Sequence, residues 1–201
     1  MIRTIISDMG NVILPFDVSL FLNRIEKYSS LSKNEVMRIP IILDGLIVSF
    51  SKGRISSKKY FDSMKEIFKV DIEFKEFKDI YCDIFSLDSS VLKTLSKLKG
   101  IFRLVLLSNT DILHFNFIKT RYPEMFIFDD YVLSYETGSV KPEDRIFEIA
   151  LEKSESDPEQ IVFIDDMEEN IRAAGKTGMK TIHFDCHMDL KRELEKFDIL
   201  F

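Results

Sequence analysis

The chain has 201 residues, enough for one good hydrophobic core or for a core plus a small second module. It is 45% hydrophobic and 31% charged, a balance typical of a folded globular protein and not of a disordered or fibrous one. The net charge of -6 comes from interleaved acids and bases, so we do not expect the basic surface that nucleic-acid binding needs.

The two cysteines, Cys82 and Cys186, are far apart and form no CxxC spacing, so we expect neither a disulfide framework nor a zinc site. No segment approaches the roughly 18 unbroken apolar residues that a membrane span needs. The first residues, Met-Ile-Arg-Thr, run directly into an apolar stretch and leave no room for a signal peptide. We therefore expect a soluble, cytoplasmic protein that binds neither nucleic acid nor membrane.

Residues 2–14 predict the first strand and the turn that follows it. They read Ile-Arg-Thr-Ile-Ile-Ser-Asp-Met-Gly-Asn-Val-Ile-Leu, an apolar run that reaches one carboxylate, Asp8, and breaks at Gly10 and Asn11. A carboxylate at the carboxyl end of a strand in an α/β sheet lies where such folds bind their ligands. Asp8 is therefore the first candidate for a functional side chain.

Residues 18–85 show helical periodicity and no convincing strand pattern. Ser32 and Ser56 are suited to helix N-caps, and Pro40 is expected to interrupt the second helical segment. Because the stretch is too long for a loop, we predict a small helical module of four or five helices.

Strands and helices alternate in the rest of the chain. Asp88 is suited to cap a helix that ends near Gly100, and Pro142 is suited to the first turn of another helix. Further strands are predicted over residues 103–107, 131–133, 161–164 and 180–184, and further helices over 112–119, 170–176 and 188–197. This alternation indicates an α/β fold with a Rossmann-like, doubly wound parallel sheet. The predicted division is an α/β core of residues 1–15 and 88–201 with the helical module at residues 16–87.

Polar side chains of different kinds follow the predicted strands: Asp8, Ser108 and Asn109, Lys141, and the pair Asp165 and Asp166. Each alone has an ordinary explanation, such as a helix cap, a turn residue or a solvated lysine. Their joint occurrence is not explained in that way. Because the carboxyl ends of parallel strands meet at one edge of the sheet, we expect these side chains to converge.

A cluster of these side chains is suited to bind a metal ion and a phosphoryl group. Carboxylates about 4 Å apart repel by roughly 4 kcal/mol per pair at an effective dielectric of ~20, so three of them need a cation. An all-oxygen ligand set without His or Cys suits Mg²⁺. A hydroxyl, an amide and an ammonium opposite the metal can hold phosphoryl oxygens, and an aspartate can form an aspartyl phosphate. The residues therefore indicate phosphoryl transfer.

Four segments carry a resemblance to a known superfamily. They are Asp-Met-Gly-Asn-Val at 8–12, Leu-Ser-Asn-Thr at 107–110, Val-Lys-Pro-Glu-Asp-Arg-Ile-Phe at 140–147 and Phe-Ile-Asp-Asp-Met-Glu-Glu-Asn at 163–170. In this order they resemble the motifs of the haloacid dehalogenase (HAD) superfamily. The closest likeness is to its small-helical-cap phosphatases whose first motif reads Asp-Leu-Gly-Asn-Val. The segment at 52–61 is similar to a cap helix-turn segment of sugar-phosphate phosphatases in this superfamily.

The resemblance implies roles for the matching residues in catalysis and substrate binding. Asp8 would be the nucleophile, and Lys141 would share the catalytic site with it. Ser108 and Lys141 would bind the phosphoryl group, with Asn109 beside them. The implied activity is hydrolysis of a small phosphorylated metabolite, with a sugar phosphate as the expected class.

The resemblance also implies a metal site. The carboxylates of Asp8 and Asp166 and the backbone carbonyl of Gly10 would bind Mg²⁺, with Asp165 close by and Asn170 supporting the aspartate pair. The helical module would form the small cap that closes over the site. No sequence feature indicates an assembly larger than a monomer or a weak homodimer.

One position departs from the usual superfamily pattern. Most of these phosphatases carry a second Asp two residues after the nucleophile as general acid and base, and this chain has Gly10 there. Three interpretations stay open. The first is a working phosphatase whose proton moves through water or another side chain, such as Asp17 or Asp44. The others are a catalytically weak phosphate- and metal-binding protein, and a 2-haloacid dehalogenase, although a dehalogenase needs no metal and leaves the Asp165-Asp166 pair unexplained.

Overall fold

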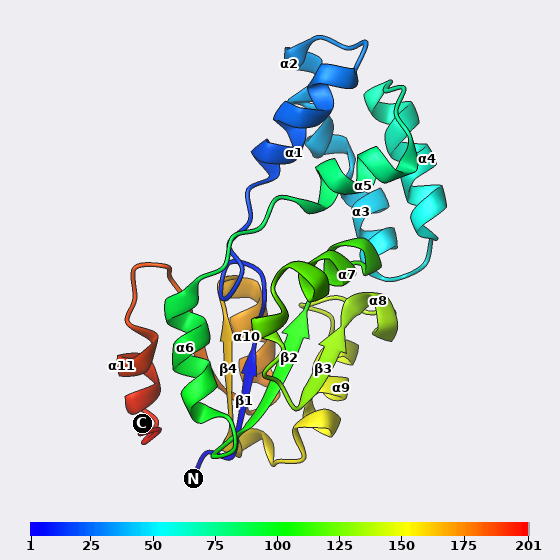
Figure 1. The fold of residues 1–201 in the computed structure, drawn as a ribbon. Coiled ribbons are helices and arrows are strands. Elements are labelled where there is room, and N and C mark those ends of the chain that lie inside the picture. The colour runs from blue at the N-terminus through cyan, green and yellow to red at the C-terminus, as the bar shows by residue number, and fades with distance from the viewer. Residues whose placement is uncertain (201) are drawn as a thin grey trace.

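A five-stranded parallel sheet forms the centre of the molecule, with strand order β3-β2-β1-β4-β5 (Figure 1). The computed structural model describes residues 1–200, apart from the side chain of residue 42. The strands are β1 (Thr4–Ser7), β2 (Arg103–Ser108), β3 (Asp130–Leu133), β4 (Ile161–Asp165) and β5 (Lys180–His183). The predicted α/β fold with a doubly wound parallel sheet is confirmed.

The register brings the strand ends to one edge. Ser7 pairs with Leu106 of β2 and with Ile164 of β4, so the residues that follow β1 and β4 emerge at the same level. Every residue of β1 is buried, as expected for a central strand rich in β-branched side chains. The central position of β1 places Asp8 between the ends of its two neighbours.

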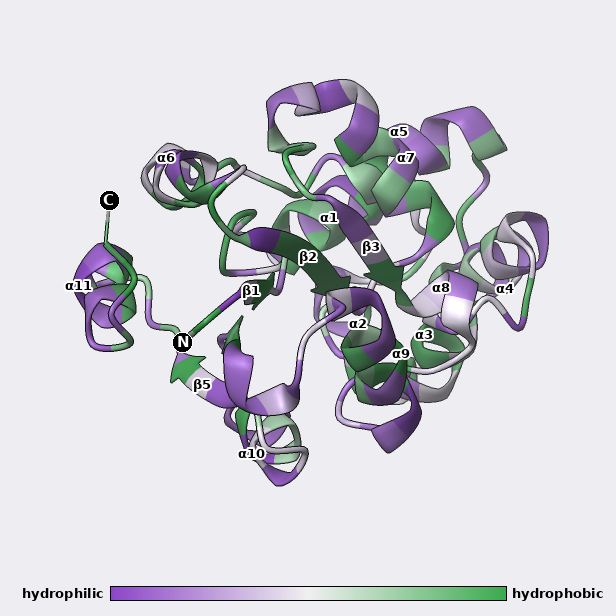
Figure 2. Cartoon of the chain, turned by 90° about the horizontal axis from the view of Figure 1, so that it is seen from below, coloured by the Kyte–Doolittle hydropathy of each residue, from purple (hydrophilic) through white to green (hydrophobic). Residues whose placement is uncertain are grey.

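Helices cover both faces of the sheet. Ile5 and Leu104 face a cluster with α6 (Ser89–Leu98), α7 (Ile112–Arg121) and α11 (Leu190–Glu195). Ile6 and Val105 face the opposite cluster with α9 (Asp144–Ser154) and α10 (Glu168–Lys176). Because successive strand residues point to opposite faces, each strand supplies both clusters. Figure 2 shows hydrophobic residues over most of β2 and at the end of β3, and a mixture of hydrophobic and hydrophilic residues along the helices.

Five α-helices lie between β1 and α6, which agrees with the predicted helical stretch. They are α1 (Val18–Ile25), α2 (Lys33–Val36), α3 (Asp44–Ser51), α4 (Ser57–Phe68) and α5 (Phe74–Cys82). Ser32 and Ser56 cap α2 and α4 as predicted, since each side chain accepts a backbone hydrogen bond in the first turn. These helices enclose a hydrophobic cluster of their own and lie beyond the carboxyl ends of the strands (Figure 1). We refer to them as the cap and to the sheet with its helices as the core.

Short elements complete the chain. They are α8 (Ser134–Thr137) and four 3-10 helices at Glu26–Tyr28, Ile39–Ile42, Pro123–Met125 and Pro158–Gln160. Pro40 lies in the second of these, where it interrupts the cap helices as expected. Within residues 1–200, no helix has the length and apolar character needed to cross a membrane.

The prediction for Pro142 is wrong. This residue follows a cis peptide bond from Lys141 and lies in a turn, and α9 begins only at Asp144 with Glu143 as its N-cap. The turn before the helix places the ammonium group of Lys141 next to Asp8, at the end of β1. This tertiary contact outweighs the preference of proline for the first turn of a helix.

The cap contacts the core at the end of α3. Gly53 has φ +65°, and a Cβ atom there would lie 2.3 Å from the backbone oxygen of Tyr135. Only glycine permits this approach of two backbones without displacement. Beside it, the buried Lys52 forms an ion pair with Glu143, in the turn that also carries Lys141. The cap is thereby held over the core on the side of the turn that carries Lys141 and Glu143.

Candidate active site

Three carboxylates converge at the edge of the sheet where the strands end. Asp8 directly follows β1, Asp165 is the last residue of β4, and Asp166 follows it. One oxygen from each side chain lies within 4.8 Å of the others. Asp165 is fully buried and Asp8 is 7% exposed, so water screens their mutual repulsion only weakly.

The ammonium group of Lys141 lies between two of these carboxylates. Its Nζ is 2.8 Å from Oδ1 of Asp8 and 2.6 Å from Oδ2 of Asp165, and it also donates to the backbone oxygen of Leu107 at 3.1 Å. Burial acts to lower the pKa of Lys141, but Asp8 and Asp165 outweigh it and raise the pKa above its ordinary value. Lys141 therefore stays charged and offsets part of the negative charge around it.

Asp8 has an unusual proton affinity for a carboxylate. Burial raises its pKa, Lys141 lowers it and Asp165 raises it again, with a net value of about 7. The backbone N–H of Met9 donates to Oδ1 of Asp8 at 2.7 Å and fixes the carboxylate plane. A further positive charge at this edge would favour the ionised form that a nucleophile needs.

Asp165 and Asp166 have different surroundings. Oδ1 of Asp165 accepts hydrogen bonds from Met167 N at 2.8 Å and Asn170 Nδ2 at 2.9 Å, and its Oδ2 faces Lys141. Oδ2 of Asp166 accepts one bond of 3.1 Å from Nδ2 of Asn11. Asp165 is therefore engaged in orienting Lys141, and Asp166 keeps more capacity for an external cation.

The loop after β2 supplies the remaining predicted residues. The side chain of Asn109 brackets the backbone of Lys141, accepting from its N–H at 2.7 Å and donating to its carbonyl at 2.9 Å. Asn109 thus holds the lysine loop in place. The side chain of Ser108 follows in the same loop and is 1% exposed. The hydroxyl of Ser134 ties this loop down by bonds to Thr110 N and O, and no motif in the sequence marks it for that role.

The donor set at this edge fits Mg²⁺. Asp8, Asp165 and Asp166 offer carboxylate oxygens, the Gly10 carbonyl lies in the turn beside them, and no imidazole or thiol belongs to the cluster. Among the described residues, the buried Oδ1 of Asn170 has no hydrogen-bond partner, so an unused oxygen acceptor remains next to the carboxylates. The arrangement can bind a hard cation and a phosphoryl group side by side.

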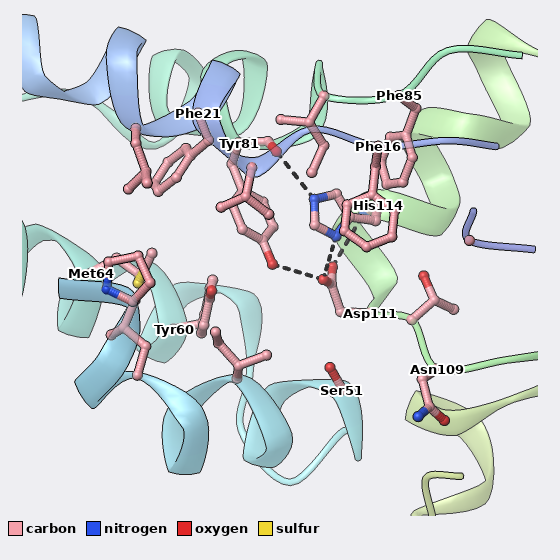
Figure 3. A pocket seen from close by; sticks show the side chains of 18 of the residues that line it. Phe16, Phe21, Ser51, Tyr60, Met64, Tyr81, Phe85, Asn109, Asp111 and His114 are labelled. Carbon is pink, nitrogen blue, oxygen red and sulfur yellow. Dashed lines mark hydrogen bonds and ion pairs between the residues drawn. The ribbon is translucent and has the colours of Figure 1, made fainter. Parts of the chain in front are cut away.

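A cavity of about 250 Å³ lies between this edge and the cap (Figure 3). Its floor includes Gly10, Ser108, Asn109 and Thr110, and the side chains of the cap form its walls. A molecule in the cavity would therefore contact the loops that carry the site on one side and the cap on the other.

The position that lacks the second Asp is covered by an aromatic ring. A Cβ atom on Gly10 would lie 3.2 Å from Cε1 of Phe16, so this ring occupies part of the space next to the turn. The sequence candidates for a substitute acid do not fill the gap. Asp17 is an exposed N-cap of α1 whose hydrogen bonds from Ser19 lower its pKa, and Asp44 is exposed on α3; neither lines the cavity.

A second polar cluster joins cap and core at the cavity wall. Oδ2 of Asp111 accepts from the hydroxyl of Tyr81 at 2.8 Å and lies 2.7 Å from Nδ1 of His114. Nε2 of His114 lies 3.1 Å from the backbone oxygen of Tyr81, and the two rings stack (Figure 3). Sequence reasoning missed His114, because its contact with Tyr81 joins residues that are 33 positions apart. Asp111 is recognisable only as a helix cap, three residues after Ser108.

Comparisons with known proteins agree with this geometry. The family described as haloacid dehalogenase-like hydrolase matches residues 2–178. The D-ribitol-5-phosphate phosphatase of Bacteroides thetaiotaomicron is 24% identical over 213 residues, covering 96% of this chain and 97% of that protein.

Solved structures show the same architecture. A HAD family enzyme of Bacteroides thetaiotaomicron, solved as a complex with magnesium and inorganic phosphate, superimposes with a TM-score of 0.85 at 24% identity, covering 96% of this chain and 99% of that one. A HAD-like family hydrolase of Porphyromonas gingivalis gives a TM-score of 0.84 at 23% identity, with 98% of each chain covered. The family match over most of the chain, together with the four motifs at one sheet edge, shows that this protein belongs to the haloacid dehalogenase-like hydrolases.

Proposed function

We propose that the protein is a Mg²⁺-dependent phosphatase that hydrolyses a small phosphate monoester through an aspartyl-phosphate intermediate. The observation that carries the proposal is the charged Lys141 between Asp8 and Asp165, next to Asp166. A buried ammonium and a cation site beside a potential nucleophile match the needs of phosphoryl transfer, which depends mainly on positioning and charge neutralisation. The relative named D-ribitol-5-phosphate phosphatase and the neighbour bound to magnesium and phosphate support the same class.

Each residue has a defined task in this mechanism. Asp8 attacks phosphorus, the bond from phosphorus to the alcohol oxygen breaks as that oxygen takes a proton from water, and the phosphoryl group is transferred to the carboxylate. Water then attacks phosphorus, which releases phosphate and restores Asp8. Lys141 and Ser108 hold the phosphoryl oxygens, while Asn109 and Asp165 fix the position of Lys141. Bound Mg²⁺, held by Asp8, Asp166 and the Gly10 carbonyl, would neutralise phosphoryl charge.

One observation favours a second candidate function. Because position 10 is glycine and the ring of Phe16 covers it, the departing alcohol lacks the usual acid, and general acid–base help contributes about 10² to 10⁴ in rate. A catalytically weak protein that binds phosphate and metal is consistent with this gap. A 2-haloacid dehalogenase is disfavoured because it leaves the cluster of three carboxylates without a purpose.

The substrate, assembly and location form the finer part of the proposal. The substrate is a small phosphorylated metabolite, and ribitol 5-phosphate is the first sugar-derived ester to test because a relative is named for it. The protein acts as a monomer or weak homodimer in the cytoplasm, without nucleic-acid or membrane partners.

Phosphate release from p-nitrophenyl phosphate and from ribitol 5-phosphate, with Mg²⁺ and with chelator, tests the proposal. We expect Mg²⁺-dependent release that is lost in Asp8→Asn and strongly reduced in Asp166→Asn. Asp71→Asn is the matched control, because Asp71 is fully exposed in the cap. Binding of Mg²⁺ and phosphate without release from either ester would support the binding protein instead.

A further inference from the structure

The two ends of the cavity differ in chemistry. The floor consists of the loops that carry the phosphoryl site, with Ser108 and Asn109 among its residues. Among the described residues that line the cavity, those from the cap include no acidic, basic or amide side chain. The cap walls are formed mainly by aliphatic and aromatic groups such as Phe21 and Met64, and Ser51 adds a hydroxyl (Figure 3).

Most polar atoms on the wall are already engaged, and the exception is Ser51, whose hydroxyl lines the cavity without a hydrogen bond to another described residue (Figure 3). The hydroxyl of Tyr81 donates to Asp111, and the remaining oxygen of Asp111 accepts from the backbone N–H groups of Leu113 and His114. Both ring nitrogens of His114 face acceptors within the same cluster. A hydroxyl group of a bound molecule would have to break these bonds to gain a partner in this cluster.

The cavity wall favours apolar alcohol groups over polyhydroxylated ones. A polyol that enters the cavity gives up hydrogen bonds to water for each hydroxyl, and a largely apolar cap wall with the one hydroxyl of Ser51 replaces few of them. An alkyl or arylalkyl chain loses nothing polar and gains from the burial of its apolar surface. The same phosphoryl site would therefore process an apolar ester more efficiently than a polyhydroxylated ester of equal length.

We propose that the alcohol part of the substrate is an apolar alkyl or arylalkyl group and that the cap cavity is its binding site. This inference rests on the proposed phosphatase function for the chemistry at the floor of the cavity. The proposed substrate class differs from the sugar phosphates that the family resemblance implies. The reason is the apolar character of the side chains that line the cavity in this cap.

Two neighbouring residues on α3 offer a matched test. Ile47 lines the cavity and is 40% exposed. Val48 is also 40% exposed but does not line it. Because both side chains are partly in solvent, replacement by Asn is expected to leave the fold intact at either position. Only Ile47→Asn adds a free amide to the cavity wall.

The first experiment compares pentyl phosphate with ribitol 5-phosphate. Both are esters of primary alcohols with five carbons, so they differ mainly in their hydroxyl groups. We expect kcat/KM for pentyl phosphate to exceed that for ribitol 5-phosphate by about tenfold or more, since most hydroxyls of ribitol would lose water without gaining a partner in the cavity. Ile47→Asn should reduce this ratio by about fivefold, and Val48→Asn should change it by less than about twofold. A wild-type preference for ribitol 5-phosphate, or equal ratios in the two variants, would overturn the proposal.

A binding experiment separates this proposal from the proposed function. Calorimetric titration with pentylphosphonate and methylphosphonate in the presence of Mg²⁺ needs no turnover. We expect the longer tail to tighten binding by about tenfold, an effect reduced in Ile47→Asn but not in Val48→Asn. Equal affinity of the two phosphonates would refute the apolar site. Tail-dependent binding without release of phosphate from any ester would support the apolar site while rejecting the phosphatase.

Discussion

The polar groups at the sheet edge and those at the cavity wall differ in how far they are already bonded to the rest of the protein. At the edge, the carboxylates of Asp8 and Asp166 each keep an oxygen without a hydrogen-bond partner among the described residues, beside the buried ammonium of Lys141. At the wall, Asp111 and His114 are also buried or nearly so, but they bond to each other and to the cap. The carboxylates of the two clusters therefore have different uses, because those at the edge keep unbonded oxygens whereas both oxygens of Asp111 are already bonded. Three experiments test this contrast.

The largest effect is expected at the edge from Lys141→Met. Without the ammonium group, Asp8 and Asp165 face each other with no fixed positive charge between them. We expect at least a 10³-fold loss of kcat/KM and a loss of about 3 kcal/mol in the free energy of unfolding of the metal-free protein. Urea unfolding and phosphate release measure the two quantities.

Lys153→Met is the matched control for this variant. Lys153 also pairs with a carboxylate, Asp130, but both groups are about a third exposed and lie away from the site. Its loss should cost about 1 kcal/mol or less and leave kcat/KM unchanged. If Lys141→Met had no larger effect than this control, the charge arrangement at the edge would not be the source of activity.

The second prediction concerns Mg²⁺ and pH. The pKa of Asp8 is raised from 3.8 to about 7. Between these two pH values, Asp8 therefore keeps its proton in the folded metal-free protein, whereas it has lost it in the unfolded chain. The stability of the metal-free protein should therefore fall as pH rises from about 4 to 7. Mg²⁺ competes with this proton, so its affinity should rise by up to about tenfold per pH unit below 7 and level off above.

Thermal unfolding at a series of pH values, with and without Mg²⁺, measures both trends. In Asp166→Asn the stabilisation by Mg²⁺ should largely disappear, whereas Asp71→Asn should keep it. A Mg²⁺ affinity that does not vary between pH 6 and 8 would contradict the role assigned to Asp8 in metal binding.

The smallest effect on activity is expected at the wall. Burial acts to raise the pKa of Asp111, but His114 and several hydrogen bonds outweigh it and hold the pKa below its usual range. Asp111→Asn should lower the free energy of unfolding by about 1–3 kcal/mol, because His114 and Tyr81 lose a charged acceptor. The ratio of kcat/KM for pentyl phosphate and ribitol 5-phosphate should stay within about twofold of the wild-type value. A shifted pH profile of kcat would instead assign this cluster to proton transfer.

The parts of the structure that sequence predicts well are those set by local patterns. Strand β1 follows from its run of β-branched residues, and Ser32 and Ser56 cap helices as their hydroxyls indicate. The meeting of Asp8 with the Asp165-Asp166 pair follows from parallel topology alone, because all strand ends share one edge.

The parts that sequence could not predict depend on long-range partners. The place of Pro142 in a turn depends on where Lys141 must reach. The bonds from the side chain of Asn109 to the backbone of Lys141 join residues that are 32 positions apart. The hydrogen bond between Tyr81 of the cap and Asp111 of the core joins residues that are 30 positions apart in the sequence. No local periodicity records such contacts, and the apolar nature of the cavity wall emerges only when the cap is placed over the core.

The most direct test of the phosphatase mechanism is to trap its intermediate. Rapid acid quenching during turnover of p-nitrophenyl phosphate, followed by peptide mass spectrometry, would locate the transferred phosphoryl group. We predict one phosphoryl group on the peptide that contains Asp8, removable by hydroxylamine and absent from Asp8→Asn. Full turnover by Asp8→Asn, or phosphate release with the phosphoryl group on another residue, would contradict the mechanism.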